Sequence, residues 1–166
     1  YAFVADSFTN WRGMEQSQGR RIKRAIHIQI SSICFCTPEM LMKFQKISLV
    51  KDYIDERQKE IKAYNKLNEV DTSVVMNGRM LTDVGVYQVY LENYLKASAM
   101  INSEMTVMVR QLAASPNGLP IEVYAFSKVK EWKAYEKVMA DIFDHALAST
   151  STFGLQIFEN PTGADI

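Results

Sequence analysis

Residues 20–30 read RRIKRAIHIQI, and this stretch decides the fold. Ile22, Ile26, Ile28 and Ile30 share one parity, and the opposite parity is polar, as in His27. Alternation with period two and β-branched side chains predicts a strand that buries one face. The apolar set changes parity after 31–32 and continues at 33 and 35, so we expect a β-bulge at the two serines.

Two helical patterns follow this strand. Thr37-Pro38-Glu39 offers a hydroxyl cap, a proline for the first turn and a carboxylate at the positive helix end. Apolar residues then recur at helical spacing from 41 to 64, and a second cap at Ser48 predicts a division into two helices. Residues 68–79 are polar and lack a period, which predicts a loop. Thr82-Asp83 begins a further helix, over about 82–98.

The second half of the chain predicts three more strands and one long helix. Alternation at 105–109 predicts a strand, Ser115-Pro116-Asn117-Gly118 a turn, and 121–125 the returning strand. Ser127 is the expected cap of a helix whose apolar stripe runs from 129 to 146. Gly154 ends that pattern, and 155–158 predict a short last strand.

The expected order from residue 22 is therefore β-α-β-β-α-β, with the helix at 82–98 counted as an extra element. This is an α+β, ferredoxin-like arrangement, in which helices cover one face of a four-stranded antiparallel sheet. Residues 2–9 are consistent with one or two strands of another sheet, and 13–19 read as a turn.

Composition limits the function classes. The 166 residues are 48% hydrophobic, which is enough for one domain with a core. Basic and acidic side chains number 19 each, so no net charge recruits nucleic acid or an anionic lipid surface. No run of about 18 apolar residues is present. Because the chain begins at Tyr1, we expect it to be a piece of a longer protein, with any membrane spans before Tyr1.

Chemistry-bearing residues are few. Cys34 and Cys36 are one residue apart in an extended segment, which suits two reduced thiols better than a disulfide or a zinc site. His145 follows Asp141 and Asp144, where a satisfied histidine at a helix end is the simpler interpretation of a possible metal or catalytic group. No hydrolase, nucleotide-binding or zinc-protease motif occurs, so we expect no enzyme activity, no metal and no cofactor.

Seven phrases spread over the chain carry a resemblance. They are NWRGM (10–14), GRRIKR (19–24), VKDYI (50–54), MVRQL (108–112), GLPIEVYAF (118–126), ADIFDH (140–145) and NPTG (160–163). Together they resemble the cytoplasmic region of the small-conductance mechanosensitive channel superfamily, and more narrowly its miniconductance branch.

The resemblance implies an organisation. Residues 1–18 would be the end of an Sm-like β domain that follows transmembrane helices absent here. Residues 19–166 would be the α/β domain of a cytoplasmic vestibule at the bacterial inner membrane. Relatives form rings of seven, whose pore opens on membrane tension during hypo-osmotic shock and releases ions and solutes. The implied partners are copies of the chain itself and the membrane, not nucleic acid.

Several residues are expected at subunit or interdomain contacts. Trp11 and Arg12 lie at the junction with the β domain, Arg20 and Arg21 open the first strand, and Tyr90 is expected to reach a neighbouring subunit. Trp11 and Trp132 are expected to be packing anchors.

A soluble ferredoxin-like regulatory or RNA-binding module is the alternative. RNA recognition on such a sheet needs exposed aromatic side chains, and the central strand offers Tyr124 and Phe126 but no matching motif.

Overall fold

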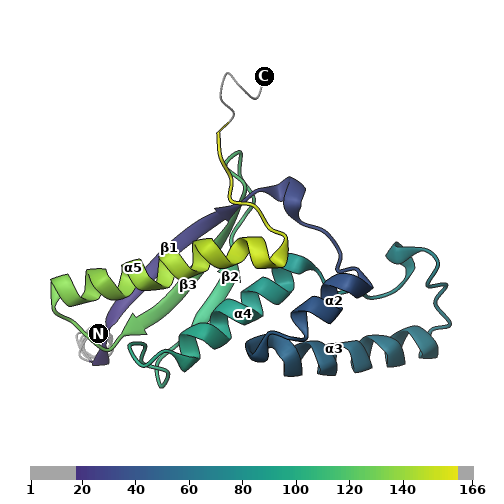
Figure 1. The fold of residues 1–166 in the computed structure, drawn as a ribbon, viewed down its shortest axis with the longest axis horizontal. Helices are drawn as coiled ribbons and strands as arrows, with labels where there is room; N and C mark the ends of the chain where they lie inside the picture. Colours follow the sequence, from purple (N-terminus) through teal and green to yellow (C-terminus); the bar gives the residue numbers. More distant parts are fainter. Residues whose placement is uncertain (1–17, 161–166) are drawn as a thin grey trace, which may run out of the picture.

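The computed structural model describes residues 18–160 as an α+β fold (Figure 1). The predictions for Trp11 and Arg12, for strands at 2–9 and for a β domain over 1–18 lie outside the described residues, apart from residue 18. The described elements are β1 (Arg20–Ile28), α2 (Pro38–Phe44), α3 (Ser48–Leu67), α4 (Asp83–Ala97), β2 (Met108–Gln111), β3 (Leu119–Ser127) and α5 (Trp132–Ser149). Short 3-10 turns are η1 (Ile30–Ser32), η2 (Val75–Asn77) and η3 (Thr150–Phe153).

The sheet is antiparallel with the order β1-β3-β2. Ile22 pairs with Ala125 and Ile26 with Ile121, and all four side chains are buried in one hydrophobic cluster with residues of α4 and α5. The alternation at 20–28 therefore produces the predicted strand with one buried face. Helices α4 and α5 lie side by side over that face (Figure 1).

The expected bulge at Ser31-Ser32 is wrong. The chain turns there through η1, and Phe35 forms an antiparallel bridge with Thr82. The N–H of Cys36 donates to the carbonyl of Leu81 at 2.8 Å, and the N–H of Asp83 donates to the carbonyl of Cys34 at 3.1 Å. The backbone of residues 34–36 is therefore hydrogen-bonded to residues 81–83. The apolar residues after the two serines are not part of the main sheet.

The helix that covers the sheet beside α5 is α4, which the sequence analysis had counted as the extra element. It buries six residues, whereas the longer α3 buries only Val50 and Ile54. Sheet coverage requires a wide apolar stripe, and α4 supplies it. Helices α2 and α3 are thus the additional elements, and they extend away from the sheet (Figure 1).

Two expected caps behave differently from prediction. The break at Ser48 is confirmed, but Ser48 is the first residue of α3 and no side chain caps that helix. Helix α5 is capped by Glu131, whose carboxylate accepts the N–H groups of Lys133 and Ala134. Ser127 is instead the last residue of β3, and its hydroxyl donates to the carbonyl of Val129 at 3.0 Å. By contrast, the Thr37 cap is confirmed, since its hydroxyl accepts the N–H of Met40.

Two strand predictions need correction. The strand expected at 105–109 lies at Met108–Gln111, because the N–H of Met105 is used in a turn with Asn102. The last strand expected at 155–158 is reduced to a single bridge between Ile157 and Ile28. Beyond that bridge, no strand among the described residues pairs with the outer edge of β1.

Candidate interaction surfaces

A tyrosine–histidine stack joins α4 to α5. The hydroxyl of Tyr90 lies 2.6 Å from Nε2 of His145, and the ring of Tyr94 stacks on the imidazole at 3.9 Å between centroids. Phe153 packs against Tyr90 at 5.2 Å. Desolvation by burial raises the pKa of Tyr90, and Tyr94 adds to the effect. This arrangement places His145 in a structural contact, in keeping with the simpler interpretation of the sequence.

Tyr90, expected at a subunit contact, is therefore half-buried and bonded within its own chain. Its role at a neighbouring subunit stays a prediction. Tyr87, one helical turn before Tyr90, is fully buried, and its hydroxyl donates to the carbonyl of Ala146.

Arg20 and Arg21 lie where β1 passes the start of α5. The guanidinium of Arg20 sits 4.2 Å from the ring centroid of Tyr135, and the hydroxyl of Tyr135 donates to the carbonyl of Arg21 at 2.6 Å. The side chain of Arg21 is exposed. The contact predicted for these two arginines with another subunit stays a prediction.

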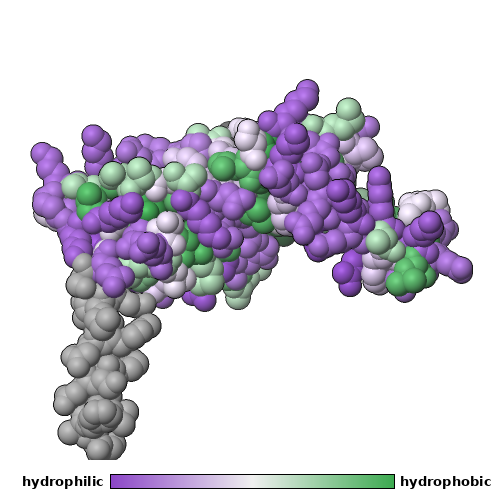
Figure 2. Space-filling model, turned by 90° about the horizontal axis from the view of Figure 1, so that it is seen from below, coloured by the Kyte–Doolittle hydropathy of each residue, from purple (hydrophilic) through white to green (hydrophobic). Residues whose placement is uncertain are grey.

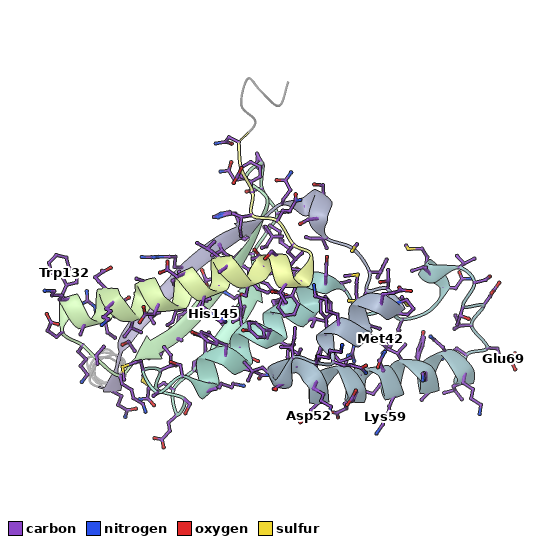
Figure 3. All side chains as sticks on the ribbon, in the orientation of Figure 1. Met42, Asp52, Lys59, Glu69, Trp132 and His145 are labelled. Atoms are coloured by element: carbon purple, nitrogen blue, oxygen red, sulfur yellow. The ribbon has the colours of Figure 1, made fainter. Side chains whose placement is uncertain are left out.

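Trp132 is not a packing anchor. It begins α5 with 69% of its surface exposed, and its indole N–H donates to the carboxylate of Glu136 at 3.3 Å. Helical spacing placed it on the apolar stripe, but the stripe of α5 begins to be buried only at Tyr135. Figure 3 shows Trp132 at the end of the molecule opposite Glu69.

The two thiols have different surroundings. Cys36 is buried, and burial raises the pKa of its thiol to about 12. Cys34 is exposed, and its Sγ lies 3.5 Å from Oδ2 of the buried Asp83. Burial raises the pKa of Cys34, and the charge of Asp83 adds to the effect. A raised pKa favours the protonated thiol, which is the less nucleophilic form, at both cysteines.

The sheet face away from the helices carries the pair predicted as a possible RNA platform. Tyr124 and Phe126 form an edge-to-face contact at 5.7 Å between centroids, and Lys23 pairs with Tyr124 across the strands. Phe126, however, is only 3% exposed. Base stacking needs aromatic rings with an exposed face, so this pair offers at most one such ring, that of Tyr124.

A shallow groove lies along the outer edge of β1. Six of its lining residues are Arg24, His27, Phe143, Leu147, Ile157 and Phe158, and we call these six the edge groove. Its walls come from β1, α5 and the segment that replaces the predicted last strand. Sequence reasoning missed it, because it exists only where that strand fails to cover β1.

An arm projects from the opposite side of the fold. It consists of the second half of α3 and the loop that follows, and Figure 1 shows it extending beyond the sheet. Its end carries exposed apolar side chains, and we call this set the arm tip: Leu67, Val74, Val75 and Met76. Figure 2 shows the arm largely hydrophilic with a hydrophobic group near its end. The sequence signal that could have indicated the arm tip is the apolar run at 74–76, which interrupts a loop predicted as polar.

The loop of the arm has local order. The N–H of Val70 donates to the carbonyl of Asn65, and the side chain of Asn65 accepts the N–H of Arg79 at 3.3 Å. Arg79 also lies over the ring of Tyr64 at 4.2 Å. These contacts fold the loop back on the last turns of α3, so the arm tip sits on a supported segment.

No helix within residues 18–160 combines the length and apolar character needed to cross a membrane. In the same residues, no group of three or more His, Cys, Asp or Glu side chains is placed to hold a metal ion. A comparison with models of known protein families finds none that matches this chain.

Proposed function

We propose that this chain is the cytoplasmic vestibule domain of a mechanosensitive ion channel of the small-conductance superfamily, in the miniconductance branch. The observation that carries the proposal is the set of seven phrases, which extends from residue 10 to residue 163. No single phrase is decisive, but the five that lie wholly within residues 18–160 cover strands, helices and a turn of the described fold.

The arrangement of elements supports this assignment. Ile157 forms a single bridge with Ile28 of β1, which β3 pairs along its other edge, so the segment lies where a fourth strand next to β1 would be. Counted as a strand, this segment would give the order of a ferredoxin-like sheet, with α4 and α5 as its two covering helices. Helices α2 and α3 would be an insertion before the first covering helix.

The proposed mechanism is geometric and involves no chemical catalysis. Identical subunits would pack side by side in a closed ring, seven in relatives, beneath a pore formed by transmembrane helices that precede this chain. Such a contact uses two different surfaces of each subunit. Side chains that face the chamber would bias which ions and solutes enter. The domain would lie on the cytoplasmic side of the bacterial inner membrane.

Patch recording under suction tests the proposal. The full-length protein is produced in cells without their own mechanosensitive channels, and a matched form lacks the region after Gly19. We expect stepwise currents from the full-length protein that rise with membrane tension, and altered or absent currents from the truncated form. A membrane-located full-length protein without any current up to lytic tension contradicts the proposal.

A second check concerns the open reading frame. Upstream of Tyr1 it should encode several apolar stretches of about 20 residues, the length that spans a bilayer. A parent protein without them would favour the soluble regulatory or RNA-binding module instead.

A further inference from the structure

We propose that the end of the fold where the chain enters β1 is the surface that receives the domain preceding this one in the same polypeptide. This end carries Met100, Asn102 and Trp132, and we call these three residues the entry end. The inference rests on the proposed function, which puts a β domain before this one and makes residues 1–18 its last part. It assigns the exposed Trp132 to a contact between two domains of one chain.

The chain reaches β1 by a fixed path at this end. The side-chain amide of Asn102 donates to the carbonyl of Gln18 at 3.1 Å, and the backbone N–H of Asn102 donates to the carbonyl of Phe126 at 2.8 Å. A Cβ on Gly19 would lie 2.8 Å from the carbonyl oxygen of Ser127, so the chain there runs directly against the end of β3. The part of the polypeptide before Gln18 is therefore joined to the domain at this surface.

The first turn of α5 lies beside the same point. The guanidinium of Arg20, two residues after Gln18, donates to the carbonyl of Lys130 at 3.5 Å. It also lies over the ring of Tyr135, at 4.2 Å from the centroid. These two contacts bracket Trp132 in the sequence. Figure 1 shows the start of β1 next to the start of α5, and Figure 3 shows Trp132 at that end.

Two large apolar side chains of the entry end are exposed. Trp132 is 69% exposed and Met100 is 45% exposed. Met100 is held next to the connection from β3 to α5, since its carbonyl accepts the N–H of Lys128 at 2.8 Å. Exposed apolar side chains that gather at one place are typical of an interaction site, and tryptophan is enriched in such sites because its ring is large and rigid.

Covalent continuity selects the occupant of the entry end. A domain that is joined at residue 18 needs no linker to reach this surface, and a tethered surface binds at an effective concentration far above that of a separate molecule. Residues 1–17 include Phe3, Phe8 and Trp11, which supply apolar side chains to the preceding domain. The 166-residue chain holds only the last part of that domain, so within this chain Trp132 keeps its exposure.

Such a contact would fix the angle between the two domains. Trp132 is the first residue of α5, and the hydroxyl of Tyr135, one turn later, donates to the carbonyl of Arg21 in β1. The preceding domain would therefore rest on a helix that is bound to the sheet close to the contact. In the proposed channel, this surface would join the pore side of each subunit to its vestibule domain.

Thiol labelling of the full-length protein in its membrane tests whether the entry end is covered. The background carries Cys34→Ser and serine at any other exposed cysteine, while the buried Cys36 remains. Trp132→Cys is compared with Met42→Cys, because the two native side chains are 69% and 67% exposed and lie far apart (Figure 3). Each rate is divided by the rate in the denatured protein, which removes differences in intrinsic reactivity.

The described fold alone would give the two positions similar labelling rates. We expect position 132 to react about tenfold or more slowly than position 42, because a covered side chain reacts only when the two domains separate. Labelling at position 132 as fast as at position 42 would mean that the entry end faces solvent, and it would overturn the inference.

Photochemical cross-linking identifies what covers position 132. Benzoylphenylalanine in place of Trp132 keeps an aromatic side chain there, so the contact is retained. We expect cross-links that join position 132 to residues before Gln18 of the same polypeptide, located by mass spectrometry, with no dimer on a denaturing gel. Benzoylphenylalanine in place of Met42 is the matched control and should give no cross-link to residues before Gln18.

The other cross-linking results contradict the inference. A cross-linked dimer would mean that a neighbouring subunit covers Trp132. Cross-links only to residues after Gln18 would mean that the domain covers Trp132 by itself, and the absence of any cross-link would mean that nothing packs there.

Failure of this inference differs from failure of the proposed function. A protein that conducts under tension but lacks the cross-links to residues before Gln18 keeps the channel and loses the contact between domains. A protein that gives these cross-links but never conducts keeps the contact and loses the channel.

Discussion

Tyr90 and His145 connect the two helices that cover the sheet, with 2.6 Å between the Tyr90 hydroxyl and Nε2 of His145. The ring of Tyr94 stacks nearly parallel on the imidazole, at an angle of 3° between the two ring planes. The contact spans 55 residues of sequence, so it forms only when α4 and α5 have both docked on the sheet.

We predict that Tyr90→Phe lowers the free energy of unfolding by about 0.5–1.5 kcal/mol, because it removes this hydrogen bond and keeps the ring. His145→Ala should cost more, since the stack with Tyr94 is lost as well. Urea unfolding of the 166-residue chain measures both changes. Tyr64→Phe is the control, because Tyr64 is exposed on the arm, and its effect should stay below about 0.5 kcal/mol. Equal effects at Tyr90 and Tyr64 would contradict the assigned bond.

Thiol reactivity should separate the two cysteines. Burial raises the pKa of Cys36 to about 12, so at pH 8 almost no thiolate is present and labelling should require unfolding. Cys34 should react in the folded chain, but more slowly than a free thiol, because burial and Asp83 also raise its pKa.

The same contacts predict the effect of Asp83→Asn. The amide removes the negative charge that disfavours the Cys34 thiolate, so the pKa should fall and the labelling rate at pH 8 should rise. Mass spectrometry after timed alkylation gives both rates. An unchanged Cys34 rate would exclude Asp83 as a cause, and rapid labelling of Cys36 in the folded chain would contradict its burial.

Two glycines with positive φ form a matched pair. Gly118 has φ +96°, and a Cβ there would lie 2.5 Å from the carbonyl oxygen of Ile28. Gly154 has φ +74°, with nothing within 4 Å of an added Cβ. Gly154→Ala should therefore cost about 1 kcal/mol from backbone strain alone. Gly118→Ala should cost clearly more, about 2–4 kcal/mol, because the clash adds to the strain. Thermal unfolding compares them, and equal losses would contradict the close approach of the turn to β1.

The exposed Trp132 leads to a prediction opposite to its expected role. Trp132→Ala should change the free energy of unfolding by less than about 0.5 kcal/mol, because little surface is buried there. Phe153 packs against Phe44 at 5.1 Å and Tyr87 at 5.4 Å between centroids, so Phe153→Ala should cost about 3–5 kcal/mol. Chemical unfolding of both variants measures these two changes in the free energy of unfolding. A large loss of stability in Trp132→Ala would mean that Trp132 makes a contact that residues 18–160 do not show.

Sequence reasoning located most elements and misjudged their partners. The strand at β1, the cap at Thr37 and the turn before β3 follow from local patterns, and each is present. The segment after Ser31-Ser32 carried a valid strand signal, yet it pairs with residues 81–83 and not with the sheet. Alternation indicates that a segment is extended, but it does not show which segment pairs with it through backbone hydrogen bonds.

The candidate surfaces show the same limit. Arg20, Arg21 and Tyr90 were singled out by type and position. The structure gives the side chains of Arg20 and Tyr90 contacts within their own chain, whereas Arg21 takes part only through its backbone carbonyl. The arm tip and the edge groove were not foreseen. From sequence alone, an apolar run such as 74–76 is compatible with a buried or an exposed position, and only the fold shows which side chains pack against it.

The sequence by itself determined which segments are helical or extended, because periodicity, caps and turn residues act within a few positions of the chain. Tertiary structure alone decided that α4 covers the sheet, that α3 projects and that residues 18–160 leave most of the outer edge of β1 unpaired. Those outcomes depend on competition for burial among segments far apart in sequence, and α4 prevailed because its apolar stripe is wider than that of α3.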